Sequence, residues 1–238
     1  MDFAVYRVNK HRQTAITPLK HRKENKMKIA LIGATGFIGS ALLNEALNRG
    51  HQVTALAAHP EKLAPRDNQL AAATDVQNLG QLTTQLHSFD AVISAFSGHA
   101  NADTLGYYVA GITNIIQAAK AAAAPRLLVV GGAGSLEVAP GVQVIDTPTF
   151  PAEYKASAEG ARQALNLLRQ ETSLNWTMLS PSAMIAPGQR TNTFRLGGDQ
   201  LLSDAEGKSH ISVEDYAVAM LNELELPQHE HQRFTVGY

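Results

Sequence analysis

Three glycines at a regular spacing are the first residues in this chain that could do chemistry. The segment from Gly33 to Gly39 follows an apolar run that ends at Ile32 and leads into a stretch of helical periodicity that begins at Phe37. The first glycine permits a tight turn, the second lets the backbone approach a ligand, and the third lets the helix pack close to the strand. Unpaired N–H groups at the start of such a helix bind phosphate groups.

The spacing predicts a dinucleotide site, because strand, glycine turn and helix follow one another in the order that this motif needs. A glycine turn of purely structural use is the alternative. The predicted contacts with the cofactor are Gly33, Ala34, Thr35, Gly36, Phe37, Ile38 and Gly39.

A sheet must position this turn. From Lys28 onward, short apolar runs alternate with segments of helical spacing, which is typical of βαβ units and of a parallel sheet buried on both faces. The predicted fold class is therefore α/β, a Rossmann-like doubly wound parallel sheet. Strands are expected at residues 28–32, 52–57, 69–73, 91–95, 126–130 and 176–179, and helices at residues 37–49, 79–87, 105–123 and about 152–170.

The pattern changes after Pro181, where Pro-Gly and Gly-Gly pairs separate short strand candidates. A last helix is expected after Ser212, whose hydroxyl can cap it, with Glu214 and Asp215 in its first turn. Residues 233–236 are expected to form a final short strand. We therefore expect one domain over residues 27–238, with a small C-terminal substrate lobe that begins at about residue 182.

Composition excludes several classes of function. The chain has no cysteine, which excludes disulfides, thiolate catalysis and cysteine-based metal sites, and its histidines have no metal-ligand spacing. A formal net charge of -1 gives no reason to expect nucleic acid, and the apolar runs are far shorter than the roughly 20 residues of a membrane span. We expect a cytoplasmic protein with a small-molecule electron acceptor as partner and no metal, nucleic acid or membrane; monomer and homodimer both stay open.

The first 26 residues differ from the rest, with nine Lys, Arg or His, two acids and almost no apolar periodicity. No apolar segment follows the basic residues, so the pattern does not predict a secretory signal. We expect residues 1–26 to be a basic, disordered tail. Either it is sequence upstream of a natural start at Met27, or it is a functional basic arm.

The residues after the second strand bear on the choice between NAD and NADP. An acid about 20 residues past the glycines would accept the ribose 2′-OH of NAD, and no acid follows Ala57 directly. An arginine that would suit NADP is also missing, because Ala58 stands there. His59 and Lys62 could contact a 2′-phosphate or could be solvated loop residues. The predicted cofactor is NADP(H) or NAD(H), and these two side chains favour NADP.

Further motifs carry a resemblance to a known family. They are the GxxGxxG spacing itself and the segments RLLVVGGAGSLEV (126–138), DTPTFPAEYK (146–155) and ISVEDYA (211–217). Together they resemble the NADH-flavin reductase family of atypical short-chain dehydrogenase/reductases (SDRs), which is also similar to the flavin reductase/biliverdin reductase B group. The resemblance runs from about Lys28 to Tyr238 and implies a Rossmann fold that binds NAD(P).

The resemblance implies further cofactor contacts just after three of the strands, at Asp75, Val76, Ala95, Phe96, Ser97, Pro181 and Ser182. Asp75 would bond the adenine and Val76 would contact its face, although Asp75 could instead cap the following helix. The segment at Phe96 would meet the cofactor ribose through its backbone, and Phe96 could equally be a core aromatic. The last two residues would border the nicotinamide.

The same resemblance points to three catalytic candidates, Ser135, Tyr154 and Lys155. SDR enzymes use a serine with Tyr-x-x-x-Lys, in which the lysine lowers the pKa of the tyrosine. Here the position four before Lys155 is Pro151, and Tyr154 points about 100° away from Lys155 on a helix. Lys155 could hold the nicotinamide ribose or lie on the surface. Ser135 could orient a substrate or stabilise its turn.

These observations predict an NAD(P)H-dependent oxidoreductase that passes hydride to a flavin, a quinone or a small carbonyl acceptor, with any flavin as substrate. Transfer to a flavin or quinone needs proximity and orientation more than a protein acid, which fits the missing tyrosine. One alternative is a non-catalytic NAD(P)-sensing regulatory protein of the NmrA type. Another is an NAD-dependent epimerase/dehydratase-like enzyme, and the fold does not decide among them.

Overall fold

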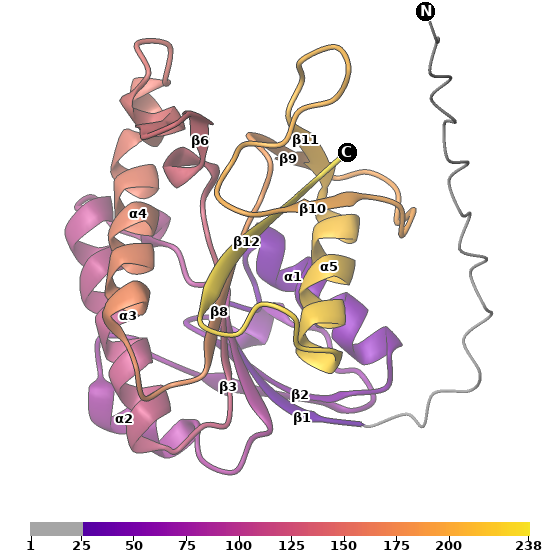
Figure 1. Cartoon of the computed structure of the whole chain (residues 1–238). Helices are drawn as coiled ribbons and strands as arrows, with labels where there is room; N and C mark the ends of the chain where they lie inside the picture. The colour runs from indigo at the N-terminus through magenta and orange to yellow at the C-terminus, as the bar shows by residue number, and fades with distance from the viewer. Residues whose placement is uncertain (1–25) are drawn as a thin grey trace, which may run out of the picture.

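The computed structural model describes residues 26–238, so the predicted basic tail lies outside the described residues except for Lys26. Within that range the centre of the molecule is an eight-stranded sheet in the order β10-β12-β8-β5-β4-β1-β2-β3 (Figure 1). Every neighbouring pair is parallel except β10 and β12. Its strands are β1 (Lys28–Ile32), β2 (Gln52–Ala57), β3 (Gln69–Ala73), β4 (Ala91–Ser94), β5 (Leu127–Val130), β8 (Trp176–Ser180), β10 (Arg195–Gly197) and β12 (Gln232–Gly237).

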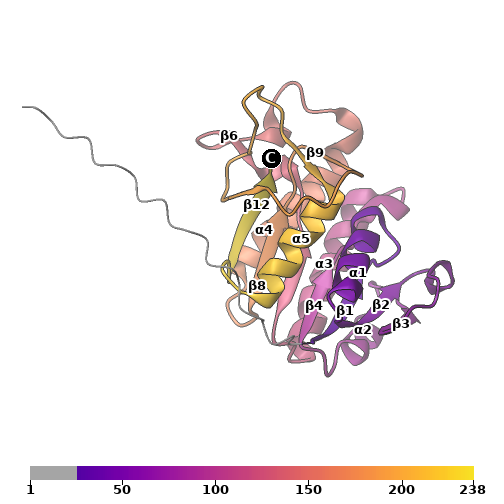
Figure 2. The ribbon, with the colours of Figure 1, turned by 90° about the vertical axis from the view of Figure 1, so that its right-hand side faces the viewer.

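Helices cover both faces of the sheet. They are α1 (Phe37–Asn48), α2 (Leu79–Gln85), α3 (Thr104–Ala121), α4 (Lys155–Gln170) and α5 (Val213–Glu225). Figure 1 shows α2, α3 and α4 on one side and α1 and α5 on the other, and Figure 2 views the side that carries α1 and α5. Each side has its own cluster of buried apolar residues. The predicted doubly wound α/β fold is confirmed.

The central strands form because apolar residues fill both of their faces. All four residues of β4 and of β5 are buried, and so are all five residues of β8. A parallel sheet between two helical layers needs such continuous apolar strands, since neither face meets water. The outer strand β3, by contrast, has no buried residue.

The starts of α5 and α4 show how single residues decide where a helix begins. The cap predicted for α5 is confirmed, because the Ser212 hydroxyl accepts the Asp215 N–H at 3.0 Å. The helix expected from about residue 152 begins instead at Lys155 as α4, after a single 3-10 turn at Ala152–Tyr154. This turn follows Pro151, whose backbone is extended and whose ring cannot donate an N–H.

The short strands lie over the carboxyl ends of the sheet. They are β6 (Glu137–Ala139), β7 (Val142–Gln143), β9 (Met184–Ala186) and β11 (His210–Ser212). Figure 1 shows β6, β9 and β11 at the end of the molecule toward which β12 points. The chain then returns to the main body through α5 and β12. Among residues 26–238, no helix combines the length and apolar character that a bilayer crossing requires.

Two buried acids tie the segment between β9 and β10 to the helices beneath it. Glu45 of α1 accepts two hydrogen bonds of 2.8 Å from Arg190 and one of 2.7 Å from Arg49. Burial raises the pKa of Glu45, but these arginines outweigh it and hold the pKa below its ordinary value. Asp215 accepts bonds from the Thr191 hydroxyl and the Asn192 N–H. The segment between β9 and β10 is therefore fixed to α1 and α5 by polar contacts.

A buried ion pair joins the sheet to the end of α5. Arg126, which precedes β5, donates to the carboxylate of Glu223 at 2.5 Å, to its carbonyl at 2.7 Å and to the Thr177 hydroxyl at 2.9 Å. Burial raises the pKa of Glu223, but bonds from His229, Gln228 and Arg126 hold it below its ordinary value.

Replacing Glu223 with alanine should lower the free energy of unfolding by about 3–5 kcal/mol, because it leaves a buried guanidinium without its carboxylate. Arg126 is only 6% exposed, so water cannot replace the lost partner. Urea unfolding followed by circular dichroism measures the change. Glu153→Ala, at an exposed carboxylate, is the control; equal stabilities for the two variants would contradict this account of the ion pair.

Candidate functional site

The first glycine of the turn occupies a position where only glycine fits. Gly33 has φ +80°, and a Cβ there would come within 2.7 Å of the Ala95 carbonyl oxygen at the end of β4. Its N–H donates to the carbonyl of Leu56 in β2 at 2.8 Å. The turn after β1 is therefore held between the carboxyl ends of its two neighbouring strands.

The other two glycines set the start of α1. A Cβ on Gly39 would lie 2.0 Å from the Gly33 carbonyl oxygen, so this glycine lets the helix pack onto the turn. Gly36 is the N-cap residue, and a Cβ there would meet nothing closer than that same oxygen, at 3.3 Å. The start of α1 is open to solvent, because Thr35, Gly36 and Phe37 are all exposed.

The N-terminus of α1 is suited to an anion. Within the described part of the chain, no side chain caps this helix and no acid occupies its first turn. The first N–H groups of a helix have no intrahelical partners and carry the positive end of the helix dipole. A glycine turn that a Cβ would fill, next to an uncapped helix start, fits the diphosphate of a dinucleotide.

The adenine-side candidates follow β3. The Asp75 carboxylate accepts the N–H of Gln77 at 2.9 Å, whereas the residue that caps α2 is Asn78, which accepts the N–H of Gln81 at 3.0 Å. The alternative in which Asp75 caps the helix is therefore wrong; its exposed carboxylate stays a candidate for the adenine. Val76 is 6% exposed and belongs to the core.

The segment after β4 combines a core aromatic with a backbone close to the glycine turn. The ring of Phe96 lies 5.6 Å from that of Tyr107 and 5.7 Å from that of Tyr108, within the cluster under α3. Its side chain is thus a packing group. Ala95 is half-buried beside Gly33 and Ser97 is exposed, so the backbone here lies at the carboxyl edge of the sheet, where the predicted ribose contact stays a prediction.

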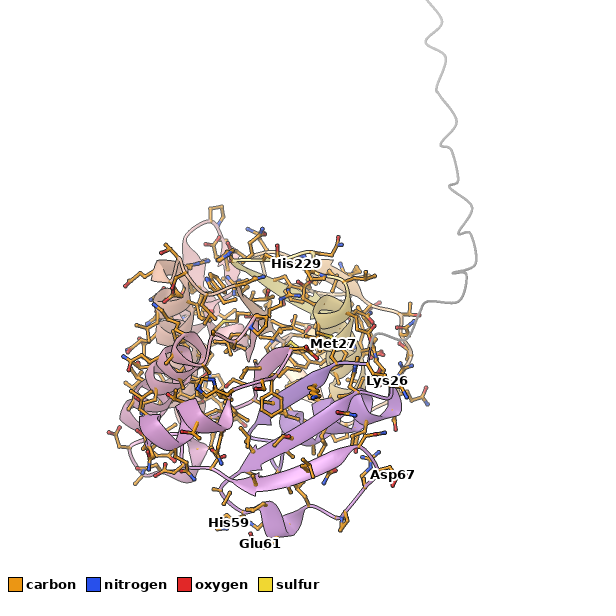
Figure 3. All side chains as sticks on the ribbon, turned by 90° about the horizontal axis from the view of Figure 1, so that it is seen from below. Lys26, Met27, His59, Glu61, Asp67 and His229 are labelled. Carbon is orange, nitrogen blue, oxygen red and sulfur yellow. The ribbon has the colours of Figure 1, made fainter. Side chains whose placement is uncertain are left out.

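The residues predicted to read a 2′-phosphate follow β2 in a 3-10 turn, η1 (Pro60–Lys62). The His59 ring nitrogen lies 3.1 Å from the Glu61 carboxylate, and the two side chains are 63% and 68% exposed. Figure 3 shows them side by side. The side chain of Lys62 is exposed and forms no hydrogen bond or ion pair with any residue in 26–238, while its backbone N–H donates to the His59 carbonyl at 3.2 Å. The sequence analysis missed Glu61 as a partner for His59.

The three catalytic candidates have different surroundings. Ser135 ends a 3-10 turn after β5, is 2% exposed, and its hydroxyl accepts a bond from Arg233 at 3.4 Å. Tyr154 is 58% exposed just before α4. Lys155 is the first residue of α4; it is exposed and pairs with no residue in the described range. Glu159, four residues later, pairs with Arg162 instead.

The start of α4 is nevertheless anchored beside the strand ends. A Cβ on Gly134, next to Ser135, would lie 2.8 Å from the Cβ of Ala158. Because Lys155 precedes Ala158 by about one helical turn, the first turn of α4 lies close to the segment that follows β5. The structure thus gives Lys155 freedom to meet a ligand but does not pair it with Tyr154.

The nicotinamide-side candidates, Pro181 and Ser182, are both buried directly after β8. The Ser182 hydroxyl donates to the carbonyl of Val236 at 2.9 Å, and a Cβ on Gly237 would lie 2.6 Å from that hydroxyl. This segment is therefore fixed against β12, and its predicted contact with the nicotinamide stays a prediction.

Arg233, a buried charged residue close to the carboxyl ends of β5 and β8, was not predicted from the sequence. Arg233 of β12 is 7% exposed and donates to the carboxylate of Asp199 at 2.7 Å. Burial lowers the pKa of Arg233 below its ordinary value. A basic residue beside the apolar Phe234 and Val236 in a predicted strand was the only signal, and it does not reveal which face the side chain takes.

An open, mostly parallel sheet with a glycine turn at its carboxyl edge defines a Rossmann-fold nucleotide-binding protein. The family model described as NAD(P)H-binding matches residues 33–224, and the chain belongs to this family. The resemblance to atypical SDR proteins is confirmed by this match and by the relatives that follow.

Three similar proteins each match almost their whole length. Uncharacterized protein YwnB of Bacillus subtilis is 42% identical over 214 residues, 88% of this chain and 98% of that protein. A solved structure from Bacteroides thetaiotaomicron, provisionally named an epimerase, is 44% identical with a TM-score of 0.84 and coverage of 89% and 96%. One from Streptococcus pneumoniae, provisionally named an NADH-flavin reductase, is 35% identical with a TM-score of 0.76 and coverage of 89% and 99%.

Two glycine substitutions should separate cofactor binding from folding. Gly36→Val should keep the fold, because its backbone is extended at φ -76° and ψ 170°, yet should weaken NADPH and NADH binding by roughly 100-fold by covering the helix start. Gly39→Ala should lower the free energy of unfolding by about 1–3 kcal/mol through the clash with Gly33. Calorimetric titration and urea unfolding measure the two effects. Tight binding by Gly36→Val would remove this turn from the site.

Proposed function

We propose that the protein is an NAD(P)H-dependent reductase that passes hydride to a flavin, a quinone or a small carbonyl compound. The observation that carries the proposal is the uncapped start of α1 at the carboxyl ends of β1 and β4, the two strands at which the strand order reverses. Ligands of open α/β sheets bind at the carboxyl ends of the strands, at the point where the strand order reverses. When bound, the reduced nicotinamide supplies the hydride.

The residues of the protein would bind and orient the cofactor. The turn from Gly33 to Gly39 would hold the diphosphate, and Lys155 would bond the nicotinamide ribose from the start of α4. Tyr154 is exposed and adjacent to Lys155, so it does not form the pair that carbonyl reduction uses in SDR enzymes. Flavins and quinones can take their proton from water, and this supports them over acceptors that need a protein acid.

The lack of a Tyr-x-x-x-Lys pair also bears on the two alternative functions, an epimerase or dehydratase and a regulatory sensor. An epimerase or dehydratase must move protons at its substrate, and among the described residues no tyrosine stands four positions before Lys155. A sensor of the NmrA type needs the cofactor site alone. Binding of the cofactor without reduction of any acceptor would therefore favour the sensor.

An acceptor screen should show turnover with NADH or NADPH and at least one of FMN, FAD or menadione, followed by the absorbance of the reduced nicotinamide. Lys155→Ala should raise KM for the cofactor about tenfold, since it removes one charge-assisted hydrogen bond to the ribose. The exposed lysine Lys208 gives the control Lys208→Ala. Full activity and affinity in Lys155→Ala would exclude this residue from the site.

We also propose NADPH as the preferred donor, because Lys62 is a free cation beside the end of β2. Lys62→Glu should weaken NADPH binding roughly tenfold and leave NADH binding nearly unchanged, since only NADPH carries the 2′-phosphate. Calorimetry with both nucleotides measures the ratio, with Lys208→Glu as the control for net charge. Equal losses of affinity for the two nucleotides would refute the proposal that Lys62 binds the 2′-phosphate.

A further inference from the structure

Tyr108 of α3 is a buried tyrosine whose hydroxyl has no partner among the described residues. The residue is 4% exposed, yet its hydroxyl forms no hydrogen bond with any residue in 26–238. By contrast, the fully buried Tyr216 donates from its hydroxyl to the Leu179 carbonyl at 2.7 Å. A tyrosine O–H usually finds a hydrogen-bond partner when it is buried. The oxygen of Tyr108 is not sealed off either, because the unpartnered side-chain atoms without solvent contact in the described range belong to other residues.

The ring of Tyr108 lies at the carboxyl edge of the sheet. Because α3 follows β4, its first turns lie at this edge, and helical side chains lean toward the start of their helix. The ring stacks on that of Phe96 at 5.7 Å, with an angle of 15° between their planes. A Cβ on Gly98 would lie 2.8 Å from the Cβ of Tyr108. Tyr108 therefore packs against the segment after β4 that is predicted to meet the cofactor ribose.

Two further contacts place the hydroxyl end of Tyr108 near the ends of β5 and β8. A Cβ on Gly160 of α4 would lie 2.8 Å from the ring, so the side chain fills the space between α3 and α4. Burial and the nearby Tyr108 both raise the pKa of Tyr216, and because such a charge effect falls with distance, the two hydroxyls lie near each other. The Leu179 carbonyl of β8, which Tyr216 bonds, also accepts the N–H of Gly131 directly after β5.

This place in the strand order suits the hydride acceptor. The glycine turn follows β1, and a dinucleotide spreads its two halves to either side of this point. The end of β2 meets the adenosine ribose, so the nicotinamide would lie on the other side, over β4 and β5. An acceptor that is placed over the nicotinamide would therefore come within reach of the Tyr108 hydroxyl.

Tyr108 differs from the tyrosine of SDR enzymes in its charge environment. In those enzymes a lysine lowers the pKa of the tyrosine, so that it gives up a proton. Here burial alone raises the pKa of Tyr108 to about 12, and no cation in the described range acts on it. Such a phenol stays protonated near neutral pH and donates a hydrogen bond without losing its proton. Donors of this kind stabilise negative charge that develops on an oxygen in a site shielded from water.

We propose that the Tyr108 hydroxyl is a catalytic group of the acceptor site, which donates a hydrogen bond to the acceptor oxygen on which negative charge develops. The inference rests on the proposed function and narrows its acceptors to rings with a conjugated carbonyl, such as a quinone or a flavin. The acceptor gains a hydride with both electrons of the broken nicotinamide C–H bond, and its oxygen gains negative charge. Water then supplies the proton, and Tyr108 keeps its own.

The test compares a charged and a neutral quinone bound to the full chain saturated with oxidised cofactor, so that no turnover occurs. The probes are 2-hydroxy-1,4-naphthoquinone, which is an anion at neutral pH, and menadione, which is neutral. Tyr108→Phe removes only the hydroxyl and keeps the ring that stacks on Phe96. It should raise Kd for the anion about tenfold and Kd for menadione less, because hydrogen bonds to charged oxygens are the stronger ones. Calorimetry measures both constants.

Tyr107→Phe is the matched control. Tyr107 is the neighbouring, half-buried residue of α3, and its ring lies 5.6 Å from that of Phe96. This variant loses the same atom one position away and should keep both Kd values. A partly unfolded Tyr108→Phe would weaken the two quinones alike, so the ratio of the two Kd values reports on the hydroxyl alone. An unchanged ratio in Tyr108→Phe, or an equal change in Tyr107→Phe, would overturn the inference.

Steady-state kinetics give a second, independent measurement. With menadione as acceptor, Tyr108→Phe should lower kcat roughly 100-fold, because it removes a donor at the oxygen that gains charge. KM for the cofactor should stay unchanged, since the hydroxyl meets the acceptor and not the cofactor. A loss confined to the KM of the cofactor would contradict the role proposed for Tyr108.

Failure of the inference can be told apart from failure of the proposed function. If the wild type reduces menadione while Tyr108→Phe keeps both the Kd ratio and kcat, only the inference fails. If the wild type binds cofactor and reduces no acceptor, the proposed function fails, and the inference fails with it.

Discussion

The contact on which the rest of the structure depends is the close approach of backbone to backbone where β1 turns into α1. Gly33 lies against the carbonyl of Ala95, and Gly39 lies against the carbonyl of Gly33, both at distances that no Cβ could share. These two contacts fix where α1 begins and which strands flank its first turn. They also place the helix start at the carboxyl edge of the sheet, and this start is uncapped because its N-cap residue, Gly36, has no side chain.

Charged groups inside the molecule hold its helices and loops to the sheet at both ends of the strands. The pair of Arg126 and Glu223 locks α5 to the strands well away from the glycine turn. Glu45 and Asp215 hold the segment that crosses above α1. Arg233 and Arg126 share one feature, because each donates to side-chain hydroxyls as well as to a carboxylate. Buried pairs are costly to desolvate, and each of these four arrangements carries further hydrogen bonds that offset the cost.

Sequence reasoning succeeded where the determinants lie within a few residues of each other. The strand at residues 28–32 and the cap at Ser212 were predicted correctly, because apolar runs and capping hydroxyls act locally. At Asp75 it left two roles open, and the structure removed one of them, because Asn78, three positions later, caps the helix. It also left out Arg233, since a strand's alternation does not say which groups from distant segments its side chains will meet.

The sequence by itself determined the class of fold and the place of the glycine turn, because periodicity and glycine spacing are encoded in consecutive residues. Only the tertiary structure decided that Phe96 is a packing group, that His59 meets Glu61, and that Lys155 stands apart from Glu159. It also decided that one guanidinium serves two strand ends. The physical reason is that hydrogen bonds and ion pairs depend on distances of a few ångströms between groups far apart in the chain, which no local pattern specifies.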